Sequence, residues 1–289
     1  MDLSLPPTPE GIVEGFGPLM PVAHILARLQ KLLSDPESGL DDISELIRLD
    51  FALASRVVQI SNSAWFGGST PCRTILDAVS RVGFKEVYHL VSIIVSNAVV
   101  ARRLVAYRQD PETLWRESVA CADAAEILAD RLGEDTGAAY MSGLLHAIGR
   151  IPVDHYLVTS HQGAKPLANE GFPGDFSGAE FAMLGFSQAE VGAVMLKKWE
   201  FARATIEPVQ WQYDPLNAPE PNDRAAAILY GARLLRTAAC QAEPIAETAN
   251  DEEIFAMLRL SREELLGFVP ELQERLARDM KIAQAQPGG

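Results

Sequence analysis

Apolar residues recur every three to four positions along much of this chain, and this spacing constrains the fold more than any other feature. Near the N-terminus, one helical face carries a continuous apolar stripe (Val22, Ile25, Leu26, Leu29, Leu32 and Leu33). No alternation of apolar and polar residues long enough for a half-buried strand is found. Only 7% of the residues are aromatic, whereas Ala and Leu are abundant. The sequence therefore predicts an all-α protein.

Capping residues locate several helix ends. Thr74 precedes an apolar periodic segment that Gly83 closes, which is typical of an N-cap and a C-terminal glycine. A helix is predicted over residues 111–132, because Pro favours the first turn and a glycine follows the last residue. Ser187 begins a capping box with the glutamate three residues later. A single long helix is predicted from about residue 85 to residue 107.

The helices are expected to form two bundles. Residues 1–16 are rich in Pro and Gly and are expected to form an irregular N-terminal arm. The first helical bundle is assigned to residues 17–107 and the second to residues 108–240. Residues 241–289 are expected to form a C-terminal helical extension. The 289 residues are enough for two modest domains, each with its own core.

The formal net charge of −14 disfavours nucleic acid as a partner, because an acidic surface repels a phosphate backbone. The most apolar stretch, residues 90–100, is too short to span a bilayer, which needs about 20 residues. The cysteines are odd in number, widely spaced and without a CxxC motif (Cys72, Cys121 and Cys240), as expected in a reducing cytoplasm. The sequence therefore predicts a cytoplasmic protein that binds neither nucleic acid nor membrane.

One short segment carries most of the functional information. Residues 143–150 read GLLHAIGR, and this segment resembles the metal-binding turn of HD-type phosphohydrolases, in which Asp follows His. Here His146 is followed by Ala147, and a methyl group cannot coordinate a cation. The motifs of nucleophilic hydrolases and of nucleotide-binding loops (GxSxG, Walker A and GxGxxG) are absent from the sequence.

Further segments extend this resemblance over roughly residues 17–213. In order they are residues 18–21 (PLMP), 49–57 (LDFALASRV), 61–67 (SNSAWFG), 74–83 (TILDAVSRVG), 114–118 (LWRES), 143–150, 184–192 (LGFSQAEVG) and 198–199 (KW). In this order and spacing the chain resembles the HDOD family, the HD-related output domain of bacterial signalling proteins. The resemblance implies an all-helical fold whose second bundle is like an HD domain, and a role that is generally non-catalytic.

The same resemblance shows which metal ligands are replaced. A His of the enzymes corresponds to Glu117, the His-Asp pair to His146 and Ala147, and a further His to Gln188. A later His pair falls around Gln212, and an Asp of the final helix falls near Arg233. One imidazole therefore remains, amides are poor ligands for transition metals, and an arginine would repel a cation. The resemblance implies no catalytic residue, no metal and no cofactor.

Two interpretations of His146 stay open. It is either a core histidine bonded to a backbone carbonyl or to Glu117, or part of a polar pocket. The pocket would be formed by the side chains at the former ligand positions together with one arginine (Glu117, His146, Arg150, Gln188 and Gln212). In that case Arg150 would be the fork that binds a small anion or a nucleotide.

The function predicted first is a non-enzymatic signalling module that acts through contacts with protein partners. The alternatives are a metal-dependent phosphohydrolase with unusual ligands, and a sensor that binds a nucleotide or a small anion in the degenerate pocket.

Overall fold

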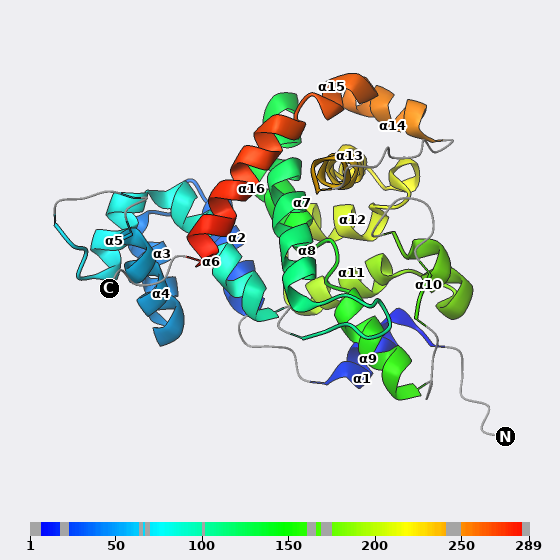
Figure 1. The fold of residues 1–289 in the computed structure, drawn as a ribbon, viewed down its shortest axis with the longest axis horizontal. Helices are drawn as coiled ribbons and strands as arrows, with labels where there is room; N and C mark the ends of the chain where they lie inside the picture. The colour runs from blue at the N-terminus through cyan, green and yellow to red at the C-terminus, as the bar shows by residue number, and fades with distance from the viewer. Residues whose placement is uncertain are drawn as a thin grey trace. The chain divides into compact units, whose positions relative to one another are not determined.

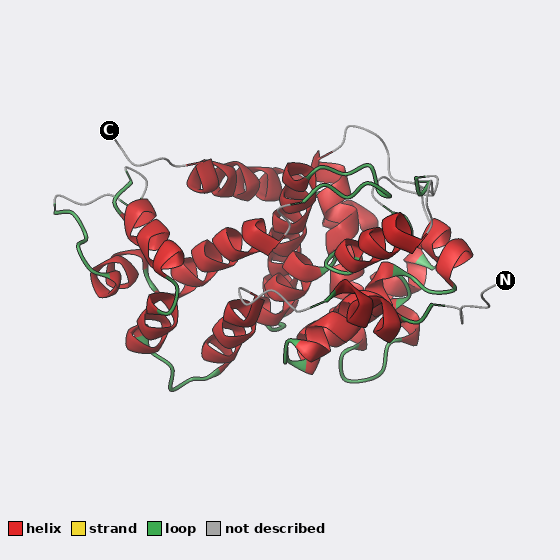
Figure 2. Cartoon of the chain, turned by 90° about the horizontal axis from the view of Figure 1, so that it is seen from below, coloured by secondary structure: helices red, strands yellow, loops and turns green. Residues whose placement is uncertain are grey.

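The structure, a computed structural model, describes residues 7–17, 23–63, 66, 70–99, 102–160, 166–168, 175–240 and 250–284. Within these ranges every regular element is a helix (Figures 1 and 2), which confirms the all-α prediction. The segment 18–21 and part of the segment 61–67 lie outside the described residues. Among the described helices, none is both long enough and apolar enough to cross a membrane.

The chain divides into two compact units. The larger unit contains residues 1–19 and 100–273, and the smaller unit contains residues 20–99 and 274–289. This division groups the two chain ends differently from the predicted ranges. The N-terminal segment and residues 250–273 group with the second bundle, and they do not form a separate arm and a separate extension.

The smaller unit is a bundle of short helices. They are α2 (Ala23–Ser34), α3 (Leu40–Arg48), α4 (Phe51–Ser61), α5 (Ile75–Val82) and α6 (Phe84–Val99). Helix α3 packs against α2, α4 and α5, and α6 packs against the same three. Asn62, directly after α4, bonds to the main chain of Cys72: its Nδ2 donates to the Cys72 carbonyl (2.9 Å) and its Oδ1 accepts from the Cys72 amide (2.7 Å).

The larger unit is built around one helix. Its elements are α1 (Pro9–Phe16), α7 (Pro111–Leu132), α8 (Thr136–Leu145), α9 (Arg150–Ser160), α10 (Ser177–Leu184), α11 (Gln188–Lys198), α12 (Arg203–Trp211), η1 (Pro215–Asn217), α13 (Asp223–Cys240), α14 (Asp251–Leu258) and α15 (Arg262–Leu266). Helix α16 (Val269–Gln284) begins in this unit with residues 269–273 and continues in the smaller unit. Every residue from 118 to 129 on α7 is buried, as expected for a helix covered on all sides. Helices α8 and α13 pack directly against α7 (Figure 1).

Two glycines, Gly143 in the last part of α8 and Gly149 in the turn between α8 and α9, allow this segment to pack closely against its neighbours. A Cβ added at Gly143 would lie 2.5 Å from the carbonyl oxygen of Cys121 on α7. A Cβ added at Gly149 would lie 2.0 Å from the carbonyl oxygen of Gln188 and 2.7 Å from the amide nitrogen of Gly192, both on α11. The end of α8 therefore lies against the main chain of α7 and the turn after it lies against the main chain of α11, and each approach requires glycine.

Two predictions about local structure are wrong. Residues 9–16 form α1 rather than an irregular arm, because the Thr8 hydroxyl accepts from the Gly11 amide (3.1 Å) and Pro9 occupies the first turn. The helix predicted over residues 85–107 ends at Val99. Beyond it, the main chains of Leu104 and Gln109 form an isolated antiparallel bridge.

Candidate functional site

His146 lies directly after α8 and is 1% exposed. Its Nδ1 is 2.8 Å from the carbonyl oxygen of Gly143. Because a carbonyl can only accept, Nδ1 carries the ring proton and Nε2 is the acceptor. Nε2 lies 3.4 Å from Nη1 of Arg236. The lone pair of the imidazole is therefore directed at a guanidinium group.

The main chain of His146 is held by two glutamines. The Nε2 atoms of Gln188 and Gln212 donate to its carbonyl oxygen at 3.0 and 2.8 Å. Nε2 of Gln188 also donates to the hydroxyl of Tyr213 (3.1 Å), and Nε2 of Gln212 also donates to the carbonyl of Val209 (2.8 Å). The capping box at Ser187 fixes the start of α11, and so positions Gln188, the first residue of that helix.

Three buried arginines surround this histidine. Arg150 begins α9, and Arg233 and Arg236 come from α13; their exposed fractions are only 2%, 2% and 3%. Nη2 of Arg233 pairs with Oδ2 of Asp175 at 3.2 Å. Nη1 of Arg150 and Nη1 of Arg236 each lie 3.5 Å from Oε2 of Glu117. Two buried guanidinium groups therefore face the same carboxylate oxygen.

Arg150 is enclosed by further contacts. Its Nη1 donates to Oε1 of Gln109 (3.1 Å), and Nε2 of Gln109 donates to Oε2 of Glu117 (2.8 Å). The guanidinium carbon lies 5.7 Å from the ring centre of Tyr107 and 5.2 Å from that of Phe176, within the range of cation–π attraction. The guanidinium of Arg150, which the sequence analysis suggested as an anion-binding group, thus already contacts a carboxylate, an amide and two aromatic rings.

Two more carboxyl groups, those of Glu180 and Asp175, bond to residues around His146. Glu180 accepts from the hydroxyl of Tyr107 (2.8 Å) and from the amide of Gln188 (2.7 Å), and burial raises the pKa of Glu180. Burial alone would also raise the pKa of Asp175, but the charge of Arg233 and several hydrogen bonds reverse this effect and lower it. Asp175 is therefore the ionised partner of Arg233.

The protonation state of His146 follows from the same surroundings. Burial lowers the pKa of His146 well below its usual value near 6.5, and the charges of Arg236, Arg150 and Arg233 lower it further. The hydrogen bond to Gly143 opposes this shift only in part. The imidazole is therefore neutral at neutral pH and acts as a hydrogen-bond acceptor.

The structure brings together all five residues that the sequence proposed for the pocket. Hydrogen bonds and ion pairs connect them into one network, which we call the His146 cluster (Glu117, His146, Arg150, Gln188, Gln212 and Arg236). Sequence reasoning missed Arg236. A usable signal was present, since Arg233 and Arg236 are three residues apart within an apolar helix and must share a face.

Ligands for a metal ion would have to come from several acidic or imidazole side chains that converge. Within the part of the chain that the structure describes, no three His, Cys, Asp or Glu side chains lie close enough together to hold one. Around His146 the charged neighbours are Glu117 and three guanidinium groups. The chemistry available there is the binding of an acceptor or an anion by guanidinium groups.

Comparison with known proteins identifies the family. The model of the HDOD domain matches residues 19–215, more than half of the chain. The chain belongs to the HDOD family. An HDOD domain protein of unknown function from Geobacter sulfurreducens superposes with a TM-score of 0.70 at 20% identity, covering 96% of both chains. The predicted family and the HD-like architecture are therefore confirmed.

Other relatives carry names from two functional classes. A Marinobacter aquaeolei VT8 protein with the provisional name of a signal transduction protein has a TM-score of 0.69 at 24% identity, covering 95% of this chain and 60% of that one. A Shewanella amazonensis SB2B protein with the provisional name of a phosphohydrolase has a TM-score of 0.64 at 23% identity, covering 94% and 97%. At these identities the likeness shows the fold alone.

A curated relative is much longer than this chain. It is an uncharacterized protein of Treponema pallidum (strain Nichols), 27% identical over 199 residues. The match covers 68% of this chain but 37% of that protein.

Proposed function

We propose that this HDOD protein is a non-catalytic signalling module of the cytoplasm, which acts through contacts with protein partners and needs no metal or cofactor. The observation that carries the proposal is the contact between Nε2 of His146 and Nη1 of Arg236. In a metal-dependent hydrolase this lone pair would have to coordinate the ion.

The residues around His146 fit a divalent cation poorly. Ala147 offers no donor atom, and Gln188 and Gln212 direct their Nε2 atoms, which are donors, at the His146 carbonyl. The carboxylate of Glu117 is already faced by two guanidinium groups. A dication placed there would meet concentrated positive charge in a buried, weakly screened environment.

The surface of the smaller unit supports a role in protein contacts. Leu49 is 67% exposed and Phe51 is 87% exposed, and the two flank the cap of α4 at the junction with α3. Large apolar side chains that are exposed side by side are typical of surfaces that bind other proteins. The net charge of −14 favours a protein over a nucleic acid as the partner.

The proposal is tested by metal loading of the full chain. The purified protein is dialysed against Mn²⁺, Fe²⁺ or Zn²⁺, bound metal is measured by mass spectrometry, and hydrolysis of bis(p-nitrophenyl) phosphate is followed. We expect substoichiometric metal and no turnover above that of His146→Ala. Substitution of the exposed His24 (H24A) is the matched control for adventitious binding by a histidine. Stoichiometric metal and hydrolysis that are both lost in His146→Ala but retained in His24→Ala would overturn the proposal.

A sensor of small anions is the second candidate, and one observation favours it. Arg150 and Arg236 are both buried and both face Oε2 of Glu117, so two guanidinium groups that attract anions lie close together in the His146 cluster. Thermal unfolding in the presence of phosphate or AMP tests this candidate. An increase in melting temperature that Arg150→Met abolishes supports it, and no change at millimolar concentration refutes it.

A further inference from the structure

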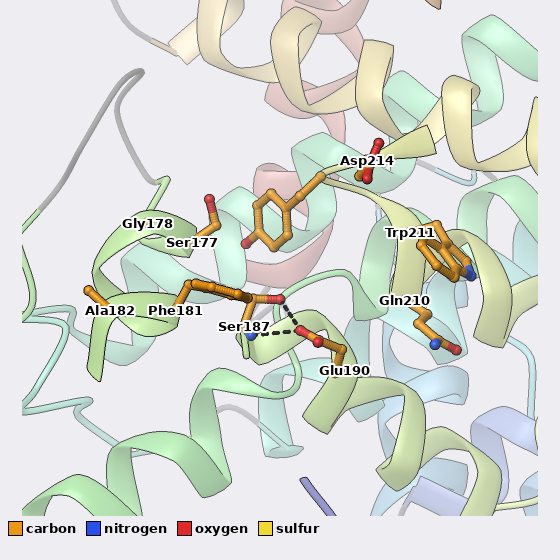
Figure 3. A pocket seen from close by; sticks show the side chains of 10 residues that line it. Ser177, Gly178, Phe181, Ala182, Ser187, Glu190, Gln210, Trp211 and Asp214 are labelled. Carbon is orange, nitrogen blue, oxygen red and sulfur yellow. Dashed lines mark hydrogen bonds between the residues drawn. The ribbon is translucent and has the colours of Figure 1, made fainter. Parts of the chain in front are cut away.

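A separate pocket lies in the larger unit beside α10 and α12. Its volume is about 560 Å³, within the usual range for small-molecule sites. Three aromatic residues contribute to its lining: Phe181 of α10, Trp211 at the end of α12, and Tyr213 just beyond. Figure 3 shows Phe181 and Trp211 on different sides of the pocket, with Asp214 near its upper edge. Phe181 is 63% exposed, so its ring is accessible to a ligand.

The charged groups of this pocket are acidic. Glu190 and Asp214 both line it, and none of the described lining residues is Lys or Arg. Oε2 of Glu190 accepts from the amide and the hydroxyl of Ser187 (2.6 and 2.7 Å), as Figure 3 shows. Oδ2 of Asp214 accepts from Nδ2 of Asn217 at 2.7 Å. These bonds fix both carboxylates and leave Oε1 of Glu190 and Oδ1 of Asp214 outside them.

We propose that this pocket binds a small organic cation, such as a quaternary ammonium ion or a substituted amine. Aromatic faces attract cations through the ring quadrupole, and the attraction increases when the cation is partly desolvated. The two carboxylates add a charge of the required sign, and they would repel a phosphate group. The combination of aromatic walls and fixed carboxylates therefore selects against the nucleotides and anions considered for the His146 cluster.

Neighbouring positive charges do not cancel this preference. The guanidinium of Arg233 lies 4.2 Å from the ring centre of Tyr213, but it is 2% exposed and paired with Asp175 at 3.2 Å. Lys197 and Lys198 line an adjoining hollow between α1, α11 and α12, which shares Glu190 and Gln210 with this pocket, and Nζ of Lys198 lies 3.8 Å from Oε1 of Glu14. The surface available to a ligand in the pocket beside α10 is therefore aromatic and acidic.

Calorimetric titration of the full chain tests the proposal. The probes are choline, benzyltrimethylammonium and the neutral isostere of choline, 3,3-dimethylbutan-1-ol. We expect both cations to bind and the alcohol to bind about tenfold more weakly or not at all. Asp214→Asn and Trp211→Leu should each weaken the binding of the cations several-fold. Asp130→Asn, which removes an exposed carboxylate on α7, should leave it unchanged.

Several outcomes would overturn the proposal. They are the absence of cation binding at millimolar concentration, equal binding of choline and the alcohol, and cation binding that Asp214→Asn does not weaken. Since Asp214→Asn keeps an acceptor for Asn217, it separates loss of charge from loss of structure, and circular dichroism checks the folding of Trp211→Leu. Metal content and hydrolysis are not involved, so failure here is distinct from failure of the proposed signalling role.

Discussion

Substitution of Gly149 by alanine gives the sharpest test of how the turn at His146 is packed. The new Cβ would lie 2.0 Å from the carbonyl oxygen of Gln188 and 2.7 Å from the amide nitrogen of Gly192. Real Cβ atoms essentially never lie within 3.0 Å of another heavy atom of this kind, so α11 would have to move by about 1 Å. Both obstructing atoms belong to the main chain, so no change of side-chain rotamer can relieve the overlap.

The expected destabilisation follows from this geometry. Overpacking of a core costs typically about 1–3 kcal/mol, and a main-chain overlap lies at the upper end of that range. The lower entropy of the unfolded alanine chain offsets this by less than about 1 kcal/mol. We therefore expect a loss of about 2–3 kcal/mol, which corresponds to a fall in melting temperature of roughly 4–12 °C.

Urea unfolding and calorimetry measure both quantities, and the chain offers a matched control. Gly15 is an exposed helical residue of α1, and a Cβ added there would meet nothing within 4 Å. Gly15→Ala should be neutral or stabilising by up to about 1 kcal/mol. If Gly149→Ala were as stable as Gly15→Ala, the close approach of the α8–α9 turn to α11 would be refuted.

Three further substitutions test individual interactions. The pKa of His146 is lowered in the folded state, so below about pH 6.5 the imidazole takes up a proton more readily in the unfolded chain than in the folded one. The free energy of unfolding should therefore fall as the pH falls, by up to about 1.4 kcal/mol per pH unit from this group. Urea unfolding at a series of pH values should show a shallower dependence for His146→Gln, and an unchanged slope would contradict the assignment. Arg236→Met should raise the pKa of His146, measured by NMR titration, because it removes the nearest positive charge; an unaltered pKa would count against the contact. Asn62→Ala removes two hydrogen bonds to the main chain of Cys72 and should lower the free energy of unfolding by about 1–3 kcal/mol. A loss below the error of urea unfolding would contradict a stabilising role for these two bonds.

Local sequence determined much of the fold. The predicted bounds of α5 and α7 agree with the structure, because Thr74 and Gly133 act as the caps that their types favour. The cap of α1 is formed by neighbouring residues as well, Thr8 and Gly11, but the Pro-rich composition of this segment favoured the prediction of an irregular arm. The end of α6 is not determined by neighbouring residues in the sequence, since residues 102–109 make contacts with distant parts of the chain. For example, Asp154 of α9 accepts from the Ala106 amide at 2.7 Å.

The site could be predicted in part, and for a different reason. The spacing of family motifs placed five residues in one cluster, and the structure joins them. Nothing in that spacing indicated that Arg236 would occupy the lone pair of His146, because the partner lies 90 residues away on α13. The acidic aromatic pocket was not predicted either. Its lining residues come from α10, α11, α12 and the segment after α12, and no short motif contains them.

The two glycines on either side of His146 restrict how this part of the domain can move. The main chain of α7 packs closely against α8 at Gly143, and the main chain of α11 packs closely against the following turn at Gly149, so no side chain lies between them at these two positions. A displacement of the main chain at these two glycines therefore cannot be absorbed by small changes of side-chain rotamer. It must either be resisted or displace complete helices, so the response at this point is discrete rather than graded.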